Sequence, residues 1–466
     1  MSKSQQALEV IVLAAGQGKR MRSRLPKVLH QLAGQPMLAH VLDCASALAP
    51  RAVHVVVGHG AEQVTAAVAG RGDAAAVRWV HQTEQRGTGD AVARALPGAA
   101  AGAVALVLYG DVPLITSGTL RACVDRALAG ELCIVTAHFE DPAQLGRIVR
   151  DEAGRIVRIV EHGDASPAER AIREINSGIL ACDAGRLGDL LSRVRPDNAQ
   201  GELYLTDVVA LAVADKMPVS GVVSADPDEV RGVNDRAQLA ELERVHQRRW
   251  AQRLMAAGVS VADPARLDVR GRVTAGMDCF LDINVVLEGD VVLGDGVRVG
   301  PGSVIRDAVL GDGVTVHAHT VIDGAEVGPG CDVGPFARLR PGTRLGANAR
   351  IGNFVETKKT VLGAGSKANH LAYLGDATLG DDCNVGAGTI TCNYDGIDKH
   401  PTTVGDRVFI GTNSTLVAPV TIESDAFVAA GTTVTSRVGA GDLAVGRSRQ
   451  RNIQGWTRPD RRKRDS

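Results

Sequence analysis

The strongest constraint on the fold is a six-residue repeat that begins after about residue 260. Small aliphatic residues recur at this interval and are often followed by glycine, as at Leu293-Gly294, Val299-Gly300, Val327-Gly328 and Val333-Gly334. Such a repeat is typical of a parallel β-helix, in which each hexapeptide forms one short strand and one turn. The stacked coils would bury a narrow column of aliphatic side chains, which agrees with the 54 glycines and the low aromatic content of 3%.

Two segments depart from the repeat, residues 364–374 and residues 391–403. Insertions leave a solenoid as loops, and loops on a rigid scaffold often carry function. These two contain His370, Tyr373 and Tyr394, in a half of the chain that is otherwise poor in rings. We therefore expect functional loops, and insertions without a role are the alternative.

The first half of the chain has a different pattern. Short apolar runs alternate with alanine-rich amphipathic segments, and the runs expected to form strands are Leu8–Leu13, Ala52–Val57, Val104–Tyr109 and Cys133–His138. This alternation predicts βα units on a mostly parallel sheet, a Rossmann-like α/β domain. A segment with apolar residues at helical spacing then predicts one long connecting helix. The expected domains are residues 1–235, a helical linker 236–258, the β-helix 259–450 and a tail 451–466.

Composition argues against several functional classes. A net charge of −1 gives no large positive surface for nucleic acid. The first residues lack an apolar signal region, and no uninterrupted apolar stretch could span a bilayer, so we expect a cytoplasmic protein. The eight cysteines are scattered without a CxxC pair, which favours reduced thiols over disulfides or a zinc site.

A glycine-rich turn follows the first expected strand, in the sequence LAAGQGKRMRSRLPK from Leu13 to Lys27. It does not fit a Walker A loop, because Lys19 follows Gly18 directly without a second glycine at the required distance. It does not fit the dinucleotide-binding fingerprint either, because Met21 stands where a third glycine is needed. Taken alone, such a turn is not specific.

Several motifs together give this turn a meaning. LxxGxGxRM followed by PK resembles the signature of sugar-nucleotide pyrophosphorylases, and residues 82–89 and 109–113 are similar to their uracil-reading and metal-site segments. The second half contains FARLRPG, GNFVETKK, KANHLAYLGD and GAGTITCNYDG. Nearly the whole chain therefore resembles bacterial bifunctional enzymes that join a glucosamine-1-phosphate N-acetyltransferase to an N-acetylglucosamine-1-phosphate uridylyltransferase.

For the first half, the resemblance implies attack of N-acetylglucosamine 1-phosphate on the α-phosphorus of UTP, with catalysis by positioning and cations. Asp111, at the end of an apolar strand, and Asn234 would hold Mg²⁺, a hard ion that prefers oxygen ligands. Taken singly, each of these residues fits a turn or a helix cap equally well. The residues expected to bind UTP or the UDP-sugar are Leu13, Ala14, Ala15, Gly16, Lys27, Gln82, Gly87, Thr88, Tyr109, Gly110, Asp111, Gly146, Glu161, Asn176 and Asn234.

For the second half, the resemblance implies acetyl transfer from acetyl-CoA to glucosamine 1-phosphate. An amine attacks a thioester only when it is unprotonated, and His370 is expected to act as the general base. The residues expected to bind the acetyl acceptor are Arg340, Lys358, Tyr373 and Asn384. Those expected to bind acetyl-CoA are Ala387, Asn393, Tyr394, Thr412, Ala430 and Arg447. Some relatives carry Ser at position 412, so the methyl group of Thr leaves the donor geometry open.

The resemblance also implies a left-handed β-helix and a homotrimer with the acetyl site between subunits. We expect no nucleic-acid or membrane partner. One alternative is a sugar-1-phosphate nucleotidyltransferase of single activity whose β-helix serves assembly only, and His370 with its neighbouring cations speaks against it. Another is a non-enzymatic scaffold, against which the intact Gly16, Lys27, Asp111 and Asn234 speak.

Overall fold

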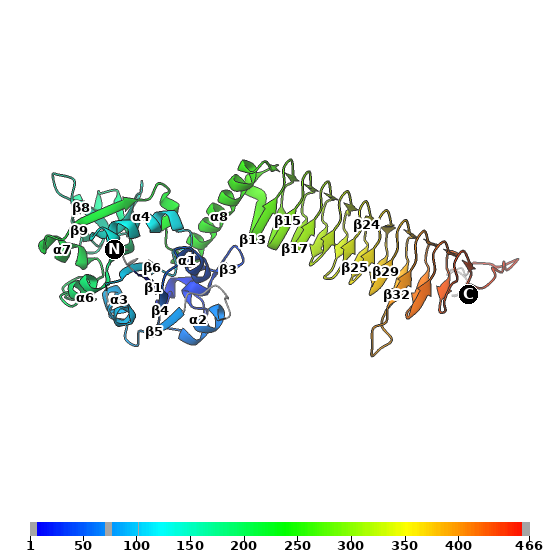
Figure 1. The fold of residues 1–466 in the computed structure, drawn as a ribbon, viewed down its shortest axis with the longest axis horizontal. Helices are drawn as coiled ribbons and strands as arrows, with labels where there is room; N and C mark the ends of the chain where they lie inside the picture. Colours follow the sequence, from blue (N-terminus) through cyan, green and yellow to red (C-terminus); the bar gives the residue numbers. More distant parts are fainter. Residues whose placement is uncertain (1–6, 70–76, 101, 459–466) are drawn as a thin grey trace, which may run out of the picture. The chain divides into compact units, whose positions relative to one another are not determined.

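The computed structural model describes residues 7–69, 77–100 and 102–458. Figure 1 shows the ribbon, which divides into two compact units, Met1–His246 and Gln247–Ser466. The boundary falls inside α8 (Arg236–Ala256). This helix confirms the predicted long helix. None of the helices in the described part of the chain has both the length and the hydrophobicity that crossing a bilayer requires.

The first unit is built on one sheet with strand order β11-β7-β10-β6-β1-β4-β5. β1 pairs in parallel with β4 and β6, as predicted, whereas β10 is antiparallel to both of its neighbours. The strands are β1 (Leu8–Leu13), β2 (Gln31–Leu32), β3 (Gln35–Pro36), β4 (Ala52–Val57), β5 (Val77–His81), β6 (Val104–Tyr109), β7 (Leu132–His138), β8 (Arg147–Arg150), β9 (Ile156–Val160), β10 (Glu174–Asp183) and β11 (Val219–Val223). The helices are α1 (Met37–Ser46), α2 (Ala61–Val68), α3 (Thr88–Ala95), α4 (Ser117–Leu128), α5 (Pro167–Arg170), α6 (Ala184–Leu191) and α7 (Asp207–Ala214).

Helices cover both faces of this sheet, which explains why its strands are apolar on both sides. Val10 and Val12 of β1 pack in one buried cluster with residues of α1, α2 and α4. Ile11, between them, faces a second cluster formed with α3, α6 and α7. The carboxyl ends of β1 and β6 are therefore the parts of these strands that remain open to a ligand.

The second unit is a parallel β-helix, as the repeat predicted (Figure 1). One of its sheets runs β12-β14-β16-β18-β21-β24-β27-β30-β33-β36-β38, and a second sheet has two arms that meet at β17. The strands of the first sheet are β12 (Ser260–Val261), β14 (Phe280–Leu281), β16 (Arg298–Val299), β18 (Thr315–Val316), β21 (Asp332–Val333), β24 (Arg350–Asn353), β27 (Lys367–His370), β30 (Asn384–Val385), β33 (Phe409–Ile410), β36 (Phe427–Val428) and β38 (Leu443–Ala444).

The second sheet begins with two long strands, β13 and β15, and continues through both arms. Its strands are β13 (Leu267–Ala275), β15 (Val285–Leu293), β17 (Val304–Leu310), β19 (Val321–Asp323), β20 (Glu326–Val327), β22 (Arg338–Leu339), β23 (Arg344–Leu345), β25 (Glu356–Lys358), β26 (Val361–Leu362), β28 (Tyr373–Gly375), β29 (Ala377–Leu379), β31 (Ile390–Cys392), β32 (Thr402–Val404), β34 (Thr415–Val417), β35 (Val420–Ile422) and β37 (Thr433–Val434).

Register pairing stacks the aliphatic residues of the repeat into one buried column. Leu281, Val299 and Val316 are consecutive register partners, and each is at most 1% exposed.

At the start of the stack, the side chain of Gln247 takes the place of a neighbouring strand. Its Nε2 donates to the carbonyl of Val269 at 2.9 Å, and its Oε1 accepts from the amide of the same residue at 2.6 Å.

The two expected loops have different outcomes. The segment 391–403 does leave the coil, because Asn384 pairs with Phe409 across it, whereas Lys367 and Asn384 pair across an ordinary coil. The prediction for residues 364–374 was wrong. This segment forms β27 and β28 in register with their neighbours, and the inward position carries the small Ala368, which hid the repeat.

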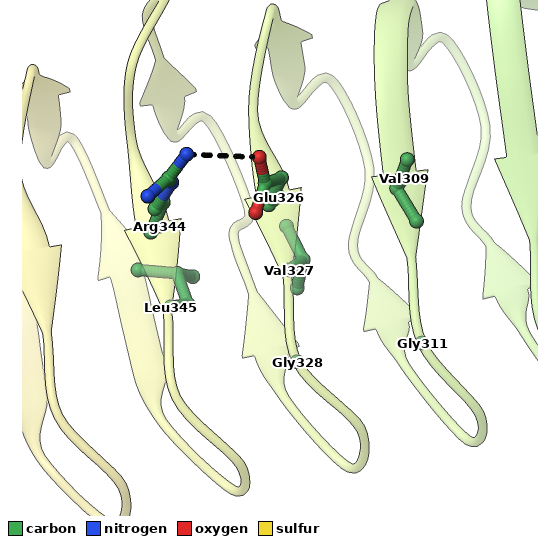
Figure 2. A pocket seen from close by; sticks show the side chains of 7 residues that line it. All are labelled: Val309, Gly311, Glu326, Val327, Gly328, Arg344 and Leu345. Carbon is green, nitrogen blue, oxygen red and sulfur yellow. Dashed lines mark hydrogen bonds and ion pairs between the residues drawn. The ribbon is translucent and has the colours of Figure 1, made fainter.

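A groove of about 430 Å³ runs over three consecutive coils on the outside of the β-helix (Figure 2). Glu326 and Arg344 form an ion pair at 3.3 Å at one side of it. Val309 lies beside them and is 47% exposed. The groove therefore presents an apolar surface with a charged border, and none of the residues predicted for catalysis lines it.

Candidate active sites

The glycine-rich turn after β1, predicted to bind phosphate, opens into a cavity of about 270 Å³ at the carboxyl ends of β1 and β6. Most of the residues predicted to bind the nucleotide line it: Leu13, Ala14, Ala15, Gly16, Lys27, Gln82, Gly87, Thr88, Tyr109 and Asp111. A Cβ added at Gly16 would have no atom within 4 Å, so the backbone there faces open space. Gly18 is left-handed, with φ of +60°, and a Cβ there would lie 2.6 Å from the Cβ of Lys27.

Lys27 brings two predicted metal ligands together. Its ammonium forms an ion pair with the carboxylate of Asp111 and donates to Oδ1 of Asn234 at 3.3 Å. A cation thus lies between a carboxylate oxygen and an amide oxygen, the donor types that suit a hard divalent ion. In the described ranges no group of three or more His, Cys, Asp and Glu side chains is arranged so that it could hold a metal ion. A metal here would therefore keep coordination positions for phosphate oxygens and water.

The end of the cavity predicted to bind the uracil is a hydrogen-bond network around Gln82. This side chain is 6% exposed, and its Nε2 donates to the carbonyl of Gly87 at 3.2 Å and to Oδ2 of Asp90 at 2.8 Å. Thr88 Oγ1 accepts from the amide of Leu205 at 3.1 Å. With its amide nitrogen occupied, Gln82 keeps its carbonyl oxygen for a ligand. Four further residues line the cavity: Val28, Gln85, Ala91 and Glu202. Gln85 lies in the segment 82–89 that resembles the uracil-reading segment of the family, and the other three were not selected from the sequence.

A second group of predicted residues lies around Glu161. The backbone amide of Asn176 donates to the backbone carbonyl of Gly146 at 2.9 Å. A Cβ added at Gly146 would lie 3.2 Å from the Glu161 carboxylate. Thr206 donates to Glu161 at 3.2 Å. Burial raises the pKa of Glu161 against the opposing effect of this hydrogen bond. Burial also raises the pKa of Tyr109, and the negative charges of Glu161 and Asp111 raise it further. Tyr109 therefore lies near both the Lys27–Asp111 pair and the residues around Glu161.

In the second unit, one corner of the β-helix collects His370 and three of the six residues predicted for acetyl-CoA, Ala387, Thr412 and Ala430. Each is followed by a residue in the left-handed conformation, Leu371, Gly388, Asn413 or Gly431. The register of β27, β30, β33 and β36, continued past the paired residues, stacks the corner residues in successive coils. We call them the corner column: His370, Ala387, Thr412 and Ala430. The guanidinium of Arg447 joins the column by donating to the carbonyl of Ala430 at 2.9 Å.

His370 has one defined hydrogen-bond partner. Its Nδ1 lies 2.7 Å from Oδ1 of Asn353, which is its register partner on β24. The ring is exposed, so its other nitrogen remains accessible. His370 is thus the last residue of a regular strand, not part of a loop, and the stacked coils fix its backbone.

The predicted acceptor residues lie on two sheets. Register places Arg340 beside Lys358 one coil along, and Tyr373 follows in the next coil. Arg340 pairs with Glu356 at 2.8 Å, and Lys358 lies 3.8 Å from Asp376. Asn384 belongs to β30 of the other sheet, so one chain does not gather the whole set on one face.

The 391–403 loop adds a cation that was missed from the sequence. The neighbouring ammonium of Lys358 lowers the pKa of Lys399, which places these two positive groups together. Asn393 is only 7% exposed and donates to Asp376, whereas Tyr394 is 59% exposed. Lys399 lies in the same loop motif as Asn393 and Tyr394, and its charge is the signal that could have identified it.

A Rossmann-like α/β domain with a glycine-rich turn lies on the same chain as a hexapeptide-repeat β-helix, the combination expected of a transferase with two separate sites. Family models match accordingly: the MobA-like NTP transferase domain at residues 10–177, the bacterial transferase hexapeptide (six repeats) at 276–307, and the hexapeptide repeat of succinyl-transferase at 401–436.

Whole-chain relatives agree. The chain is 55% identical over 455 residues to the Bifunctional protein GlmU of Pseudomonas entomophila (strain L48), covering 98% of this chain and 99% of the relative. It is 55% identical to that of Stutzerimonas stutzeri (strain A1501), with 98% and 100% covered, and 53% identical to that of Azoarcus sp. (strain BH72), with 97% and 99% covered. The chain belongs to the family of bifunctional GlmU proteins. It is an enzyme with two activities, uridylyl transfer and acetyl transfer.

Proposed function

We propose that each unit carries one step in the synthesis of UDP-N-acetylglucosamine. Residues 259–450 transfer the acetyl group of acetyl-CoA to glucosamine 1-phosphate, and residues 1–235 then transfer the uridylyl group of UTP to the product. Residues 236–258 link the two domains, and of the expected tail, 451–466, residues 459–466 lie outside the described part of the chain. The observation that carries this proposal is the corner column, because it stacks a histidine directly under the residues expected to bind acetyl-CoA.

In the first site, an oxygen of N-acetylglucosamine 1-phosphate attacks the α-phosphorus of UTP, and the bond to pyrophosphate breaks. The turn at Gly16 and the ammonium of Lys27 bind phosphate oxygens, and the Glu161 group binds the sugar. Asp111 and Asn234 would hold Mg²⁺, which would neutralise charge on the phosphates. Support comes from the Lys27 ammonium, a cation already between these two oxygens.

In the second site, the free ring nitrogen of His370 accepts a proton as the amine of glucosamine 1-phosphate attacks the thioester carbonyl. The tetrahedral intermediate collapses, the carbon–sulfur bond breaks, and coenzyme A leaves as a thiol. Arg340, Lys358 and Lys399 bind the acceptor phosphate, which would stabilise the crowded positive charge of the two lysines. This crowding supports a dianion at that place.

We also propose a cytoplasmic homotrimer. The acceptor residues are divided between two sheets of one chain, and another copy would supply the side of the acceptor site that one chain lacks. The groove beside Val309, with its apolar surface and charged border, supports association between copies. The trimer would be refuted if the protein sedimented as a monomer in analytical ultracentrifugation and the same sample had full acetyltransferase activity.

The test is to assay both reactions on the full chain and on two variants. Wild-type protein should release coenzyme A thiol from acetyl-CoA with glucosamine 1-phosphate, and pyrophosphate from UTP with N-acetylglucosamine 1-phosphate. His370→Ala should lose only the first reaction and Asp111→Asn only the second. Loss of both reactions in either variant would contradict two independent sites.

A further inference from the structure

The proposed base needs its proton on a particular ring nitrogen. A neutral imidazole carries one hydrogen, and only the other nitrogen has a lone pair that can accept a proton. If His370 accepts the proton through Nε2, the hydrogen must be on Nδ1. The contact with Asn353 decides which ring nitrogen carries the hydrogen, because Nδ1 of His370 lies 2.7 Å from Oδ1 of Asn353.

The backbone makes this contact a fixed feature. Asn353 ends β24 and His370 ends β27, and the two residues are register partners in adjacent coils. The amide of Leu371 donates to the carbonyl of Asn353 at 3.1 Å, which holds the two corners together. Phe354 and Leu371, the residues that follow, share the left-handed conformation. Both side chains therefore project from equivalent positions one coil apart.

We propose that Asn353 is a positioning residue for acetyl transfer, which holds the hydrogen of His370 on Nδ1 and leaves Nε2 as the proton acceptor. A carbonyl oxygen can only accept, so the Asn353 side chain selects this tautomer and the ring orientation together. The inference rests on the proposed role of His370.

The neighbouring coil on the other side agrees with this arrangement. Continuing the register of β30 places Ala387 next to His370, and a methyl group neither competes for a ring proton nor fills the space beside the ring. Asn353 is thus the one amide among the immediate register partners of His370.

Three variants test the proposal. Asn353→Leu keeps the side-chain size and removes the acceptor, and we expect kcat for acetyl transfer to fall about 10- to 100-fold. The KM values for acetyl-CoA and glucosamine 1-phosphate should stay within about twofold, because a positioning residue touches neither substrate. Asn353→Asp keeps an accepting oxygen and should retain most of the activity, with the acid limb of the pH profile moved to higher pH.

Far-UV circular dichroism of the same purified variants monitors folding of the β-helix, and uridylyl transfer monitors the first unit. Unchanged kcat in Asn353→Leu, while His370→Ala abolishes acetyl transfer, would overturn the positioning role and leave the proposed base intact. Full acetyl transfer in His370→Ala would instead overturn the proposed base. If Asn353→Leu does not fold, Asn353→Asp decides. Two results would contradict an accepting oxygen at this position: a pH profile of acetyl transfer identical to that of the wild type, or a loss of kcat at every pH.

Discussion

Gly18 allows a sharp test of the phosphate-binding turn, because a side chain there would reach the site through Lys27. An added Cβ would lie 2.6 Å from the Cβ of Lys27. Carbon atoms make ordinary contacts at about 3.5–4.0 Å, so Gly18→Ala must displace Lys27 by roughly 1 Å. A displacement of that size at a catalytic centre can reduce a rate about 100-fold.

The stability cost can be separated from this effect. A left-handed alanine costs about 1–2 kcal/mol, and the crowding adds about 1–3 kcal/mol. Gly154 is a matched control, because its φ is +77° and a Cβ added there would have nothing within 4 Å. Gly154→Ala should therefore carry the backbone cost alone.

Both variants would be assayed for pyrophosphate release, for thiol release and for the free energy of unfolding in urea. We expect Gly18→Ala to lose uridylyl transfer about 100-fold with acetyl transfer unchanged, and Gly154→Ala to keep both reactions. Uridylyl transfer in Gly18→Ala close to that of Gly154→Ala would refute the reasoning, since Lys27 would then tolerate the displacement.

Two further predictions concern charge. Because burial raises the pKa of Glu161, the native state holds this proton more tightly than the unfolded chain, and stability falls as pH rises from the ordinary carboxyl value through the raised one. Glu161→Gln should therefore increase Tm at neutral pH but not below about pH 4, while weakening the binding of N-acetylglucosamine 1-phosphate; an equal Tm shift at both pH values would contradict this. Lys399→Met should raise KM for glucosamine 1-phosphate about tenfold, the loss of a charge-assisted hydrogen bond of roughly 1.5 kcal/mol, with little change in kcat for acetyl transfer. Steady-state kinetics would show this, and an unchanged KM would remove Lys399 from the phosphate site.

The sequence predicted the β-helix because one aliphatic side chain per hexapeptide is enough to show an inward position. It failed at residues 364–374, where Ala368 fills the axis and a small residue carries little periodic signal. The left-handed corners were also hidden. Phe354 and Leu371 adopt them without glycine, since the stacked hydrogen bonds on both sides stabilise a conformation that local preference disfavours.

The sequence placed Asp111 and the glycine-rich turn at one edge of the sheet of the first unit because each follows a strand end. The other residues expected to bind the nucleotide came from the family resemblance. Contacts made by distant segments could not be predicted. Lys358 and Lys399 are adjacent only because the 391–403 loop returns to the face of β25. The hydrogen bond from His370 to Asn353 depends on a coil of 17 residues, one fewer than three hexapeptides, and on side-chain geometry that the periodic pattern does not define.

The side chain of Gln247 has a consequence for assembly. A stack of parallel strands presents unpaired peptide groups at its first coil, and such an edge is a template on which further chains can add to form fibres. The amide of Gln247 satisfies both peptide groups of Val269 with the geometry of a strand. At this position of the first coil, the connecting helix therefore occupies the groups with which an added strand would pair.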